Sequence, residues 1–291
     1  MVRPGLLREA KRTPRRGVGW VMHILAVRDT ADYRATFAEY PGDMRQSWHS
    51  HDEAIVTMIL AGQVREGVGR HEQSAGPMEI GIKPAGIPHT DHFGPRPLRA
   101  VRIAVPTAGA ATGNPLTVLQ QWTWRTSPMA CRALCGAANA LMHRDEDAVD
   151  GHVWDALAGL ASSPVPVHAG NPPTWLRQAH DHLLDAGGTA PLRALALTAG
   201  VHPVHFAAQF RRYYGCSTSE FRQNHRVQRA TGLVCRSRIP LSQIAAMLGY
   251  ADQAHFTRQF RKVIGVSPGR FRLLTSGSPP FDHSRRSREV S

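Results

Sequence analysis

The stretches LALTAGVHPVHFAAQFRRYYGCS (195–217) and IAAMLGYADQAHFTRQFRKVIGVS (244–267) are two copies of one diverged repeat, and they decide the fold of the C-terminal region. The motif HFxxQFR begins at His205 in the first copy and 50 residues later, at His255, in the second. Upstream of the turn the two copies are 49 residues apart, not 50. The second copy therefore has one more residue in the turn, where a change of length costs little. The repeat predicts two structural units of the same shape.

Each copy has the pattern of a helix-turn-helix unit. An amphipathic helix ends at a glycine, Gly200 or Gly249, which can take the positive φ of a helix C-cap, and a second helix follows. In that second helix two phenylalanines stand four residues apart and therefore share one buried face. The opposite face is free to enter a groove of DNA.

The outward faces of the two copies differ in what they offer to a base pair. Arg258 in the second copy is suited to bidentate hydrogen bonding with guanine, whereas Ala208 in the first copy offers no such bond. The first unit therefore provides mainly apolar contacts. We expect DNA contacts from Val204, His205, Ala207, Ala208, Arg211, Arg212, Arg226, Gln253, Ala254, His255, Arg258, Arg261 and Lys262.

Charge is segregated along the chain in a way that fits DNA binding. Residues 172–275 contain 14 lysines and arginines against 4 acidic residues, whereas residues 21–171 contain 12 against 15. The C-terminal region is thus suited to a polyanion. A merely solvated basic surface is the alternative.

The remaining chain divides by its pattern of apolar residues. Short apolar runs at 21–27, 54–62, 78–84 and 98–105, broken by glycine and proline, predict strands, and residues 115–160 predict helices. Residues 217–235 predict a helix that connects the two repeats. We expect a disordered basic arm (1–20), a sensor domain (21–110), a helical dimerisation and interdomain segment (111–161), a linker (162–173), the DNA-binding domain (174–275) and a disordered tail (276–291).

These motifs resemble a known family. The first repeat, RVQRATGLV (226–234) and PLSQIAAMLGYADQAHFTRQFRKVIGVSPGRFR (240–272) resemble the DNA-binding domain of AraC/XylS transcription regulators. The resemblance implies a cytoplasmic, non-membrane homodimer that binds double-stranded DNA, a small-molecule effector and RNA polymerase. Arg226 takes a structural, capping or phosphate-binding role. Ala208 departs from the family, which usually has arginine there.

A second resemblance concerns the N-terminal region. SWHSHDEAIVTMILAG (47–62) and KPAGIPHT (83–90) are similar to the two short motifs of the cupin barrel, a common sensor domain of this family. On a strand His49, His51 and Glu53 would point to one side, and His89 would join them after a turn. Such a set suits zinc, iron or nickel. An organic effector without metal, or histidines with a structural role, remain alternatives.

The predicted fold is therefore two-domain α+β: an N-terminal cupin-like β-barrel with helices and a C-terminal all-α domain with two helix-turn-helix units. Two functions compete. A ligand-controlled, non-enzymatic transcription regulator that requires no cofactor explains both the tandem repeat and the segregated charge. A cupin metalloenzyme, such as a dioxygenase or isomerase with an accessory helical domain, explains only the three histidines.

Overall fold

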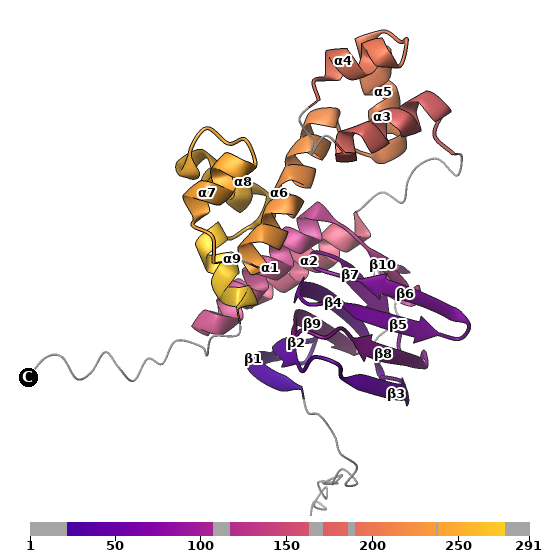
Figure 1. Cartoon of the computed structure of the whole chain (residues 1–291). Coiled ribbons are helices and arrows are strands. Elements are labelled where there is room, and N and C mark those ends of the chain that lie inside the picture. The colour runs from indigo at the N-terminus through magenta and orange to yellow at the C-terminus, as the bar shows by residue number, and fades with distance from the viewer. Residues whose placement is uncertain (1–21, 107–116, 163–170, 186–189, 237, 277–291) are drawn as a thin grey trace, which may run out of the picture.

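A computed structural model shows how these elements are arranged (Figure 1). The residues it describes are 22–106, 117–162, 171–185, 190–236 and 238–276. The predicted arm and tail, and most of the predicted linker, lie outside these residues. None of the described helices is long and apolar enough to cross a membrane.

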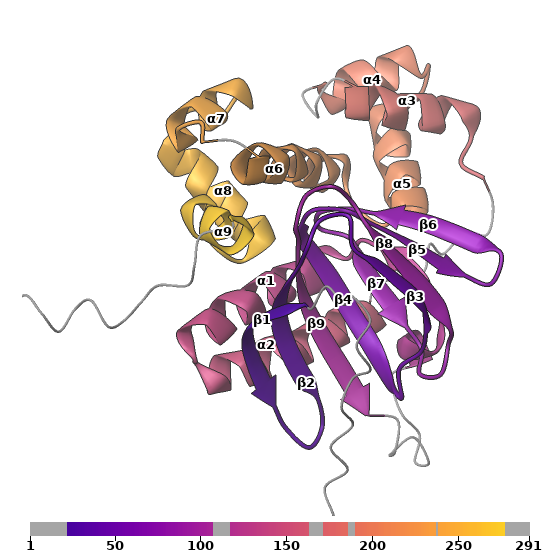
Figure 2. The ribbon, with the colours of Figure 1, turned by 60° about the horizontal axis from the view of Figure 1, so that its bottom comes forward.

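The N-terminal region consists of two antiparallel sheets that face each other (Figure 2). The larger sheet has strand order β1-β2-β9-β4-β7-β10, and the smaller one β3-β8-β5-β6. The four predicted strands correspond to β1, β4, β7 and β9. The strands are β1 (His23–Asp29), β2 (Arg34–Tyr40), β3 (Arg45–His49), β4 (Glu53–Ala61), β5 (Val64–Val68), β6 (His71–Ala75), β7 (Ile80–Lys83), β8 (His89–Phe93), β9 (Leu98–Pro106) and β10 (Thr123–Arg125).

The larger sheet is apolar on both faces because its strands alternate between two cores. On β4, Met58 and Leu60 belong to the core outside the barrel, whereas Ile59 joins Tyr40 and Trp124 in the core between the sheets. Successive side chains of a strand point to opposite faces, so a continuous apolar run on β4 serves both cores. The outer face of this sheet must consequently be covered by other elements.

Helices α1 (Pro128–His143) and α2 (Glu146–Ala161) cover that face as an antiparallel hairpin (Figure 2). The side chain of Asp145 caps α2 by accepting a hydrogen bond from the Ala148 amide at 3.1 Å. Gly136 of α1 lets the ring of His152 approach so closely that an added Cβ would lie 2.6 Å from it. Small residues on α1 therefore permit tight packing of the hairpin.

The expectation of helices alone between residues 115 and 160 is wrong at one place. Residues 123–125 form β10, which pairs with β7 and extends the larger sheet, and a 3₁₀ turn precedes it (Thr117–Gln120). The ring of Trp124 packs directly over Gly81, where an added Cβ would lie 2.8 Å from the indole. A strand of three residues has too short a pattern to show in the sequence.

The C-terminal region is all helical, and the two-domain α+β architecture is confirmed. The first unit has its own core around Leu176, Phe206 and Phe210. Helix α6 connects it to the second unit. The helices are α3 (Thr174–Asp185), α4 (Leu192–Thr198), α5 (Pro203–Tyr214), α6 (Thr218–Arg236), α7 (Leu241–Met247), α8 (Gln253–Ile264) and α9 (Pro268–Thr275).

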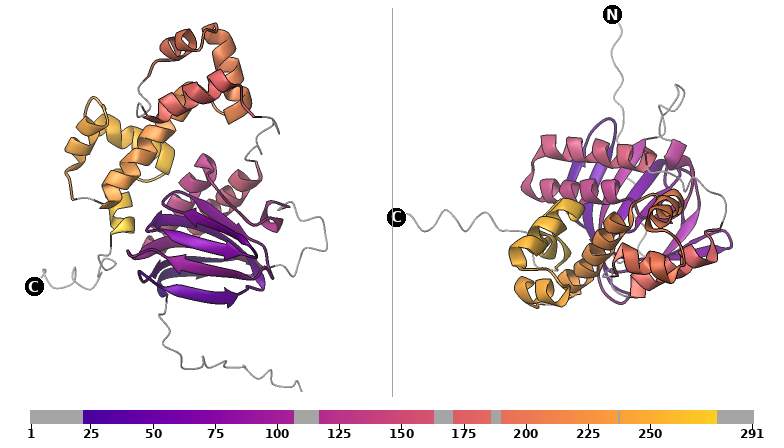
Figure 3. Two further views of the ribbon diagram at one scale, coloured as in Figure 1. Left: turned by 45° about the vertical axis from the view of Figure 1, so that its right-hand side comes forward. Right: turned by 90° about the horizontal axis from the view of Figure 1, so that it is seen from above.

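The second unit, unlike the first, shares one continuous core with the N-terminal region. Phe256 and Phe260 belong to the same buried cluster as Leu134 of α1 and Met58 of β4. The view from above in Figure 3 shows α9 beside the α1–α2 hairpin. The two regions are therefore packed together through α1.

Hydrogen bonds from three arginine side chains reinforce this packing. Arg132 Nη1 of α1 donates to the carbonyl oxygen of Lys262 at 3.3 Å. Arg270 of α9 donates to the side chain of Asn139, also on α1. Arg99 of β9 donates to the carbonyl oxygen of Leu274 at 3.1 Å, and this contact is buried. Each one joins a side chain to the opposite region.

We predict that Gly265→Ala lowers the free energy of unfolding more than Gly249→Ala does. Both glycines have positive φ, +90° and +70°, which costs an alanine about 1–2 kcal/mol. At Gly265 the new methyl group would also lie 2.7 Å from the backbone oxygen of Arg132, whereas at Gly249 it meets nothing within 4 Å. We expect about 1–3 kcal/mol of additional loss from overpacking. Urea denaturation followed by circular dichroism measures both; equal losses would contradict a tight α1–α8 contact.

Candidate DNA-binding surface and histidine site

The two helix-turn-helix units begin their second helices in the same way. In the first unit His202 caps α5, and its Nδ1 accepts from the Val204 amide at 3.3 Å. In the second unit Asp252 caps α8, and its carboxylate accepts from the His255 amide at 2.6 Å. The caps are 50 residues apart, as the repeat requires. The first turns of α5 and α8 therefore occupy equivalent positions in the two units.

The exposure of side chains separates a buried face from an outward face on both helices. Phe206, Phe210, Phe256 and Phe260 are fully buried, as their spacing predicts. Of the predicted contact residues, Ala207, Arg226 and His255 are half-buried. The others are exposed: Val204, His205, Ala208, Arg211, Arg212, Gln253, Ala254, Arg258, Arg261 and Lys262.

Positive charge gathers at the C-terminal ends of α5 and α8. Arg211 and Arg212 occupy the last turn of α5, and Arg261 and Lys262 occupy the last turn of α8. A cation there is favoured by the partial negative charge of the helix C-terminus. Arg258 stands a turn earlier on α8, exposed on the same side as Ala254 by its spacing of four residues. The side chain of Arg258 therefore lies away from the buried face of α8.

Arg226 of α6 is placed differently from these exposed cations. Its guanidinium lies 5.4 Å from the centre of the Tyr250 ring, and its Nε is buried without a hydrogen-bond partner. Beside it, Gln223 of α6 donates a hydrogen bond to Gln259 of α8. These contacts hold the second unit against α6, which supports the structural role for Arg226 among those that the resemblance implied.

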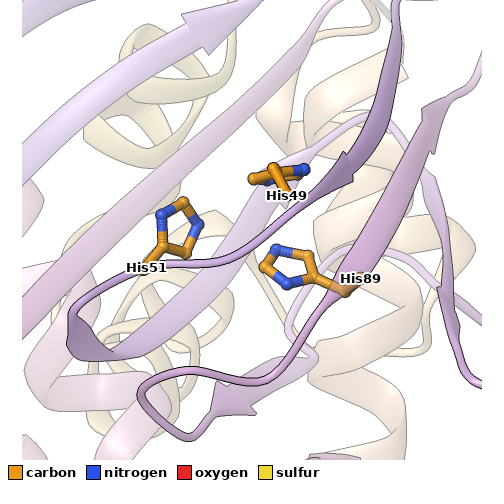
Figure 4. Close-up of side chains that lie close together, drawn as sticks. All are labelled: His49, His51 and His89. Carbon is orange, nitrogen blue, oxygen red and sulfur yellow. The ribbon is translucent and has the colours of Figure 1, made fainter.

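Three histidines meet on the smaller sheet, as Figure 4 shows. His49, His51 and His89 each offer one ring nitrogen, and these three atoms lie within 4.8 Å of one another. The rings of His49 and His89 are 4.2 Å apart between centres. The sequence placed all three on one strand and a turn, but His49 ends β3 whereas His51 lies in the connection to β4. The predicted alternation of His49, His51 and Glu53 along one strand is therefore wrong.

Backbone carbonyl groups fix which nitrogen of two rings is available. Nδ1 of His49 lies 2.8 Å from the oxygen of Ser47, and Nδ1 of His89 lies 3.0 Å from the oxygen of Ile87. A carbonyl oxygen only accepts, so each Nδ1 carries the hydrogen and each Nε2 presents a lone pair. Nε2 of His89 is buried and has no hydrogen-bond partner. Nε2 of His89 therefore suits a metal ion, because it has no other partner and the backbone carbonyl of Ile87 holds the other nitrogen of the ring.

The surroundings keep two of these imidazoles neutral. Burial, together with the positive charge of Arg102, lowers the pKa of His51 to about 3. Burial, followed by the charge of Lys83, also lowers the pKa of His89. Neutral imidazoles are the form that binds a metal. The donor set is therefore ready at neutral pH.

Glu53 lies outside this group, and a different carboxylate lies beside it. Glu53 begins β4 opposite Pro106 and is not among the groups that approach one another closely enough to share an ion. Asp91, which sequence reasoning missed, has Oδ2 at 3.8 Å from Nε2 of both His49 and His89. Asp91 stands two residues after His89 on β8, so strand alternation is the signal that points to it.

The barrel also encloses a small cavity next to the histidines. Its volume is about 110 Å³, and His51, Lys83, Asp91 and Arg102 are among the side chains that line it, together with Trp124. Apolar walls with a few charged groups are typical of small-molecule sites. This cavity is too small for more than a compact ligand.

Comparisons with known proteins concern the C-terminal region above all. A family model described as a helix-turn-helix domain matches residues 195–273. The arabinose operon regulatory protein of Escherichia coli is 30% identical over 92 residues, 32% of this chain and 31% of that protein, so the match spans about a third of that relative. The probable transcription factor PqrA of Proteus vulgaris is 30% identical over 89 residues, 31% of this chain and 71% of PqrA.

Among solved structures, the C-terminal domain of AraT, a response regulator from Geobacillus stearothermophilus, is similar to this chain with 25% sequence identity. The TM-score is 0.35, and the alignment covers 39% of this chain and 96% of that domain.

Proposed function

The chain belongs to the AraC/XylS family of transcription regulators, and we propose that it binds specific DNA sequences under the control of a small molecule held in its N-terminal barrel. The single observation that carries this proposal is the pair of equivalent helices α5 and α8. Each begins at a side-chain cap, buries a pair of phenylalanines and turns its opposite face to solvent. Two such helices in one chain suit two segments of a DNA groove.

The connecting helix supports reading by both units at once. α6 has 19 residues, and at 1.5 Å per residue it spans about 28 Å. Successive major-groove faces on one side of a duplex are about 34 Å apart. α6 contributes Phe221 to the core of the first unit and Val227 to the core of the second, so we expect the helix to hold the two units apart before DNA binds. One chain would thus contact two adjacent groove segments.

The two units have different tasks in this proposal. Arg258 reads a guanine from α8, and exposed Arg261 and Lys262 contact phosphates. On α5, Val204 and Ala208 are exposed but offer only apolar contact, for instance to thymine methyl groups. The first unit positions the chain on DNA, and the second unit supplies most of the sequence preference.

The barrel serves as the sensor and not as a catalyst in this proposal. His49, His51 and His89 would hold a divalent metal ion, whose positive charge would lie beside the cavity proposed for the effector. Their surroundings supply the neutral donors and the enclosed cavity. The enzyme alternative rests on the same three histidines and leaves the two DNA-binding units without a purpose. Cytoplasmic location, a homodimer and contact with RNA polymerase complete the proposal.

Strand β9 offers a route from the sensor to the DNA-binding region. Arg102 of β9 lines the barrel cavity, and Arg99, three residues before it, contacts the end of α9. Arg99 also forms an ion pair with Glu39 of β2, at 2.6 Å. A ligand that shifts β9 would move Arg99, which contacts the end of α9. We propose that occupancy of the cavity alters how firmly the second unit is held.

We predict salt-sensitive binding of duplex DNA by the full chain. Binding should fall by about 0.9 log units per log unit of salt for each phosphate that is neutralised. Fluorescence anisotropy at several salt concentrations measures the slope. The variant Arg261→Ala should weaken all sequences alike and lower the slope by about one unit. A folded chain without salt-sensitive DNA binding would end the regulator proposal.

We predict that Arg258→Ala costs about 1–3 kcal/mol of binding free energy and relaxes the preference at one base pair. Val204→Ala in the first unit is the matched control and should have a smaller, mostly steric effect. Binding-site selection with the wild type and both variants compares the two groove segments. Equal or stronger preference in the segment read by α5 would contradict the argument from Ala208 and would implicate His202 or His205 in base reading.

We predict that the triple variant His49→Ala/His51→Ala/His89→Ala contains no metal after expression in metal-supplemented medium, because every imidazole ligand is lost. Elemental analysis of the purified protein is the measurement. His92→Ala is the control, since His92 alternates with Asp91 on β8 and points to the other face. A wild-type protein free of metal under these conditions would refute the metal site and leave the DNA-binding proposal intact.

A further inference from the structure

We propose that Asp91 is the fourth ligand of the metal ion held by His49, His51 and His89. The inference rests on the proposed metal site and adds to it a carboxylate. A set of three imidazoles and one carboxylate suits zinc, iron or nickel as the divalent ion. The distances, the hydrogen-bonding partners and the burial of Asp91 each support this assignment.

The distances place Asp91 beside two of the three imidazoles, those of His49 and His89. Its Oδ2 lies 3.8 Å from Nε2 of His49 and 3.8 Å from Nε2 of His89. Two ligands of a tetrahedral ion with bonds of 2.0–2.1 Å are about 3.3 Å apart. The observed separations thus exceed the liganded value by about half an ångström. A small inward movement of the side chains completes the geometry.

The two rings nearest Asp91 turn one nitrogen to the backbone and leave the other for a ligand. Nδ1 of His49 and of His89 faces a backbone carbonyl, so in the neutral ring it carries the hydrogen. Each Nε2 then presents a lone pair 3.8 Å from the electron-rich carboxylate oxygen. Lys83 Nζ, at 3.4 Å from that oxygen, offsets part of its charge, and a cation among the ring nitrogens would offset the repulsion that remains. A divalent ion removes the repulsion and satisfies the orphaned Nε2 of His89.

Two further charged side chains hold the carboxylate in position. Lys83 Nζ lies 3.1 Å from Oδ1 of Asp91 and 2.9 Å from Oε2 of Glu66. Glu66 is fully buried and also accepts a hydrogen bond from the indole of Trp122. Lys83 also donates to Oδ2 of Asp91, at the longer distance of 3.4 Å, so the ammonium group holds the whole carboxylate beside the imidazoles. Lys83 and Glu66 act as positioning residues, in the way that outer partners orient metal ligands.

The test is the binding of Co²⁺ to the metal-free full chain, followed by visible absorption and by competition with Zn²⁺. Asp91→Asn should weaken Co²⁺ binding on the order of 10–100-fold or more, the loss known even for outer partners of metal sites, and should change the absorption bands. Asp91→Glu keeps the carboxylate and should retain binding with an altered spectrum. Glu53→Gln, which changes the carboxylate outside the group, should leave both affinity and spectrum unchanged.

The outcomes separate this inference from the metal site on which it rests. Wild type that binds Co²⁺ together with an Asp91→Asn variant of unchanged affinity and spectrum would overturn the role of Asp91 and leave the three-histidine site standing. Wild type that binds neither Co²⁺ nor Zn²⁺ would overturn both. Circular dichroism of each variant establishes that it is folded; should Asp91→Asn fail to fold, the altered spectrum of Asp91→Glu decides, and an unaltered one counts against Asp91.

Discussion

The packing of α1 is the constraint on which the rest of the structure depends. The larger sheet has an apolar outer face, and α1 covers it, pairs with α2 and meets the second helix-turn-helix unit. Residues 133–138 of α1 are all buried, so this stretch is covered by neighbours on every side. Cys135, Ala137 and Ala138 of α1 have no exposed surface, and Gly136 lets α2 approach closely. Small side chains on α1 allow the larger sheet, α2 and the second helix-turn-helix unit to pack against this one helix.

This arrangement holds the two DNA-binding units in unequal ways. The second unit is fixed by a shared core, by α6 through Gln223 and Arg226, and by polar contacts from α1 and β9. The first unit has a separate core and is joined to the second through α6. In the proposed division of labour, the unit that reads bases is thus the one in contact with the sensor. Control of sequence reading needs that contact.

Local patterns of the sequence predicted most of the C-terminal region and only part of the histidine site. The phenylalanine pairs and the connecting helix depend on spacing within one element, which the sequence displays directly. Glu53 was predicted beside the histidines because side chains alternate regularly along a strand, but β3 ends at His49 and Glu53 begins the next strand, β4. Asp91 acquires its place through Lys83 and Glu66, which come from other strands. The contact of Arg99 with Leu274 spans 175 residues, and no local pattern signals it.

The magnitudes of the interdomain contacts match what control by a ligand requires. Coupling between two sites in a protein is typically about 1–3 kcal/mol. A hydrogen bond that involves a charged group contributes about 1.5–3 kcal/mol, so the buried bond from Arg99 to Leu274 falls in this range by itself. The shared apolar core contributes far more and differs little between states that keep it packed. A ligand beside Arg102 therefore needs to alter only the polar contacts of β9, and the second unit can be released in part while the domains stay together.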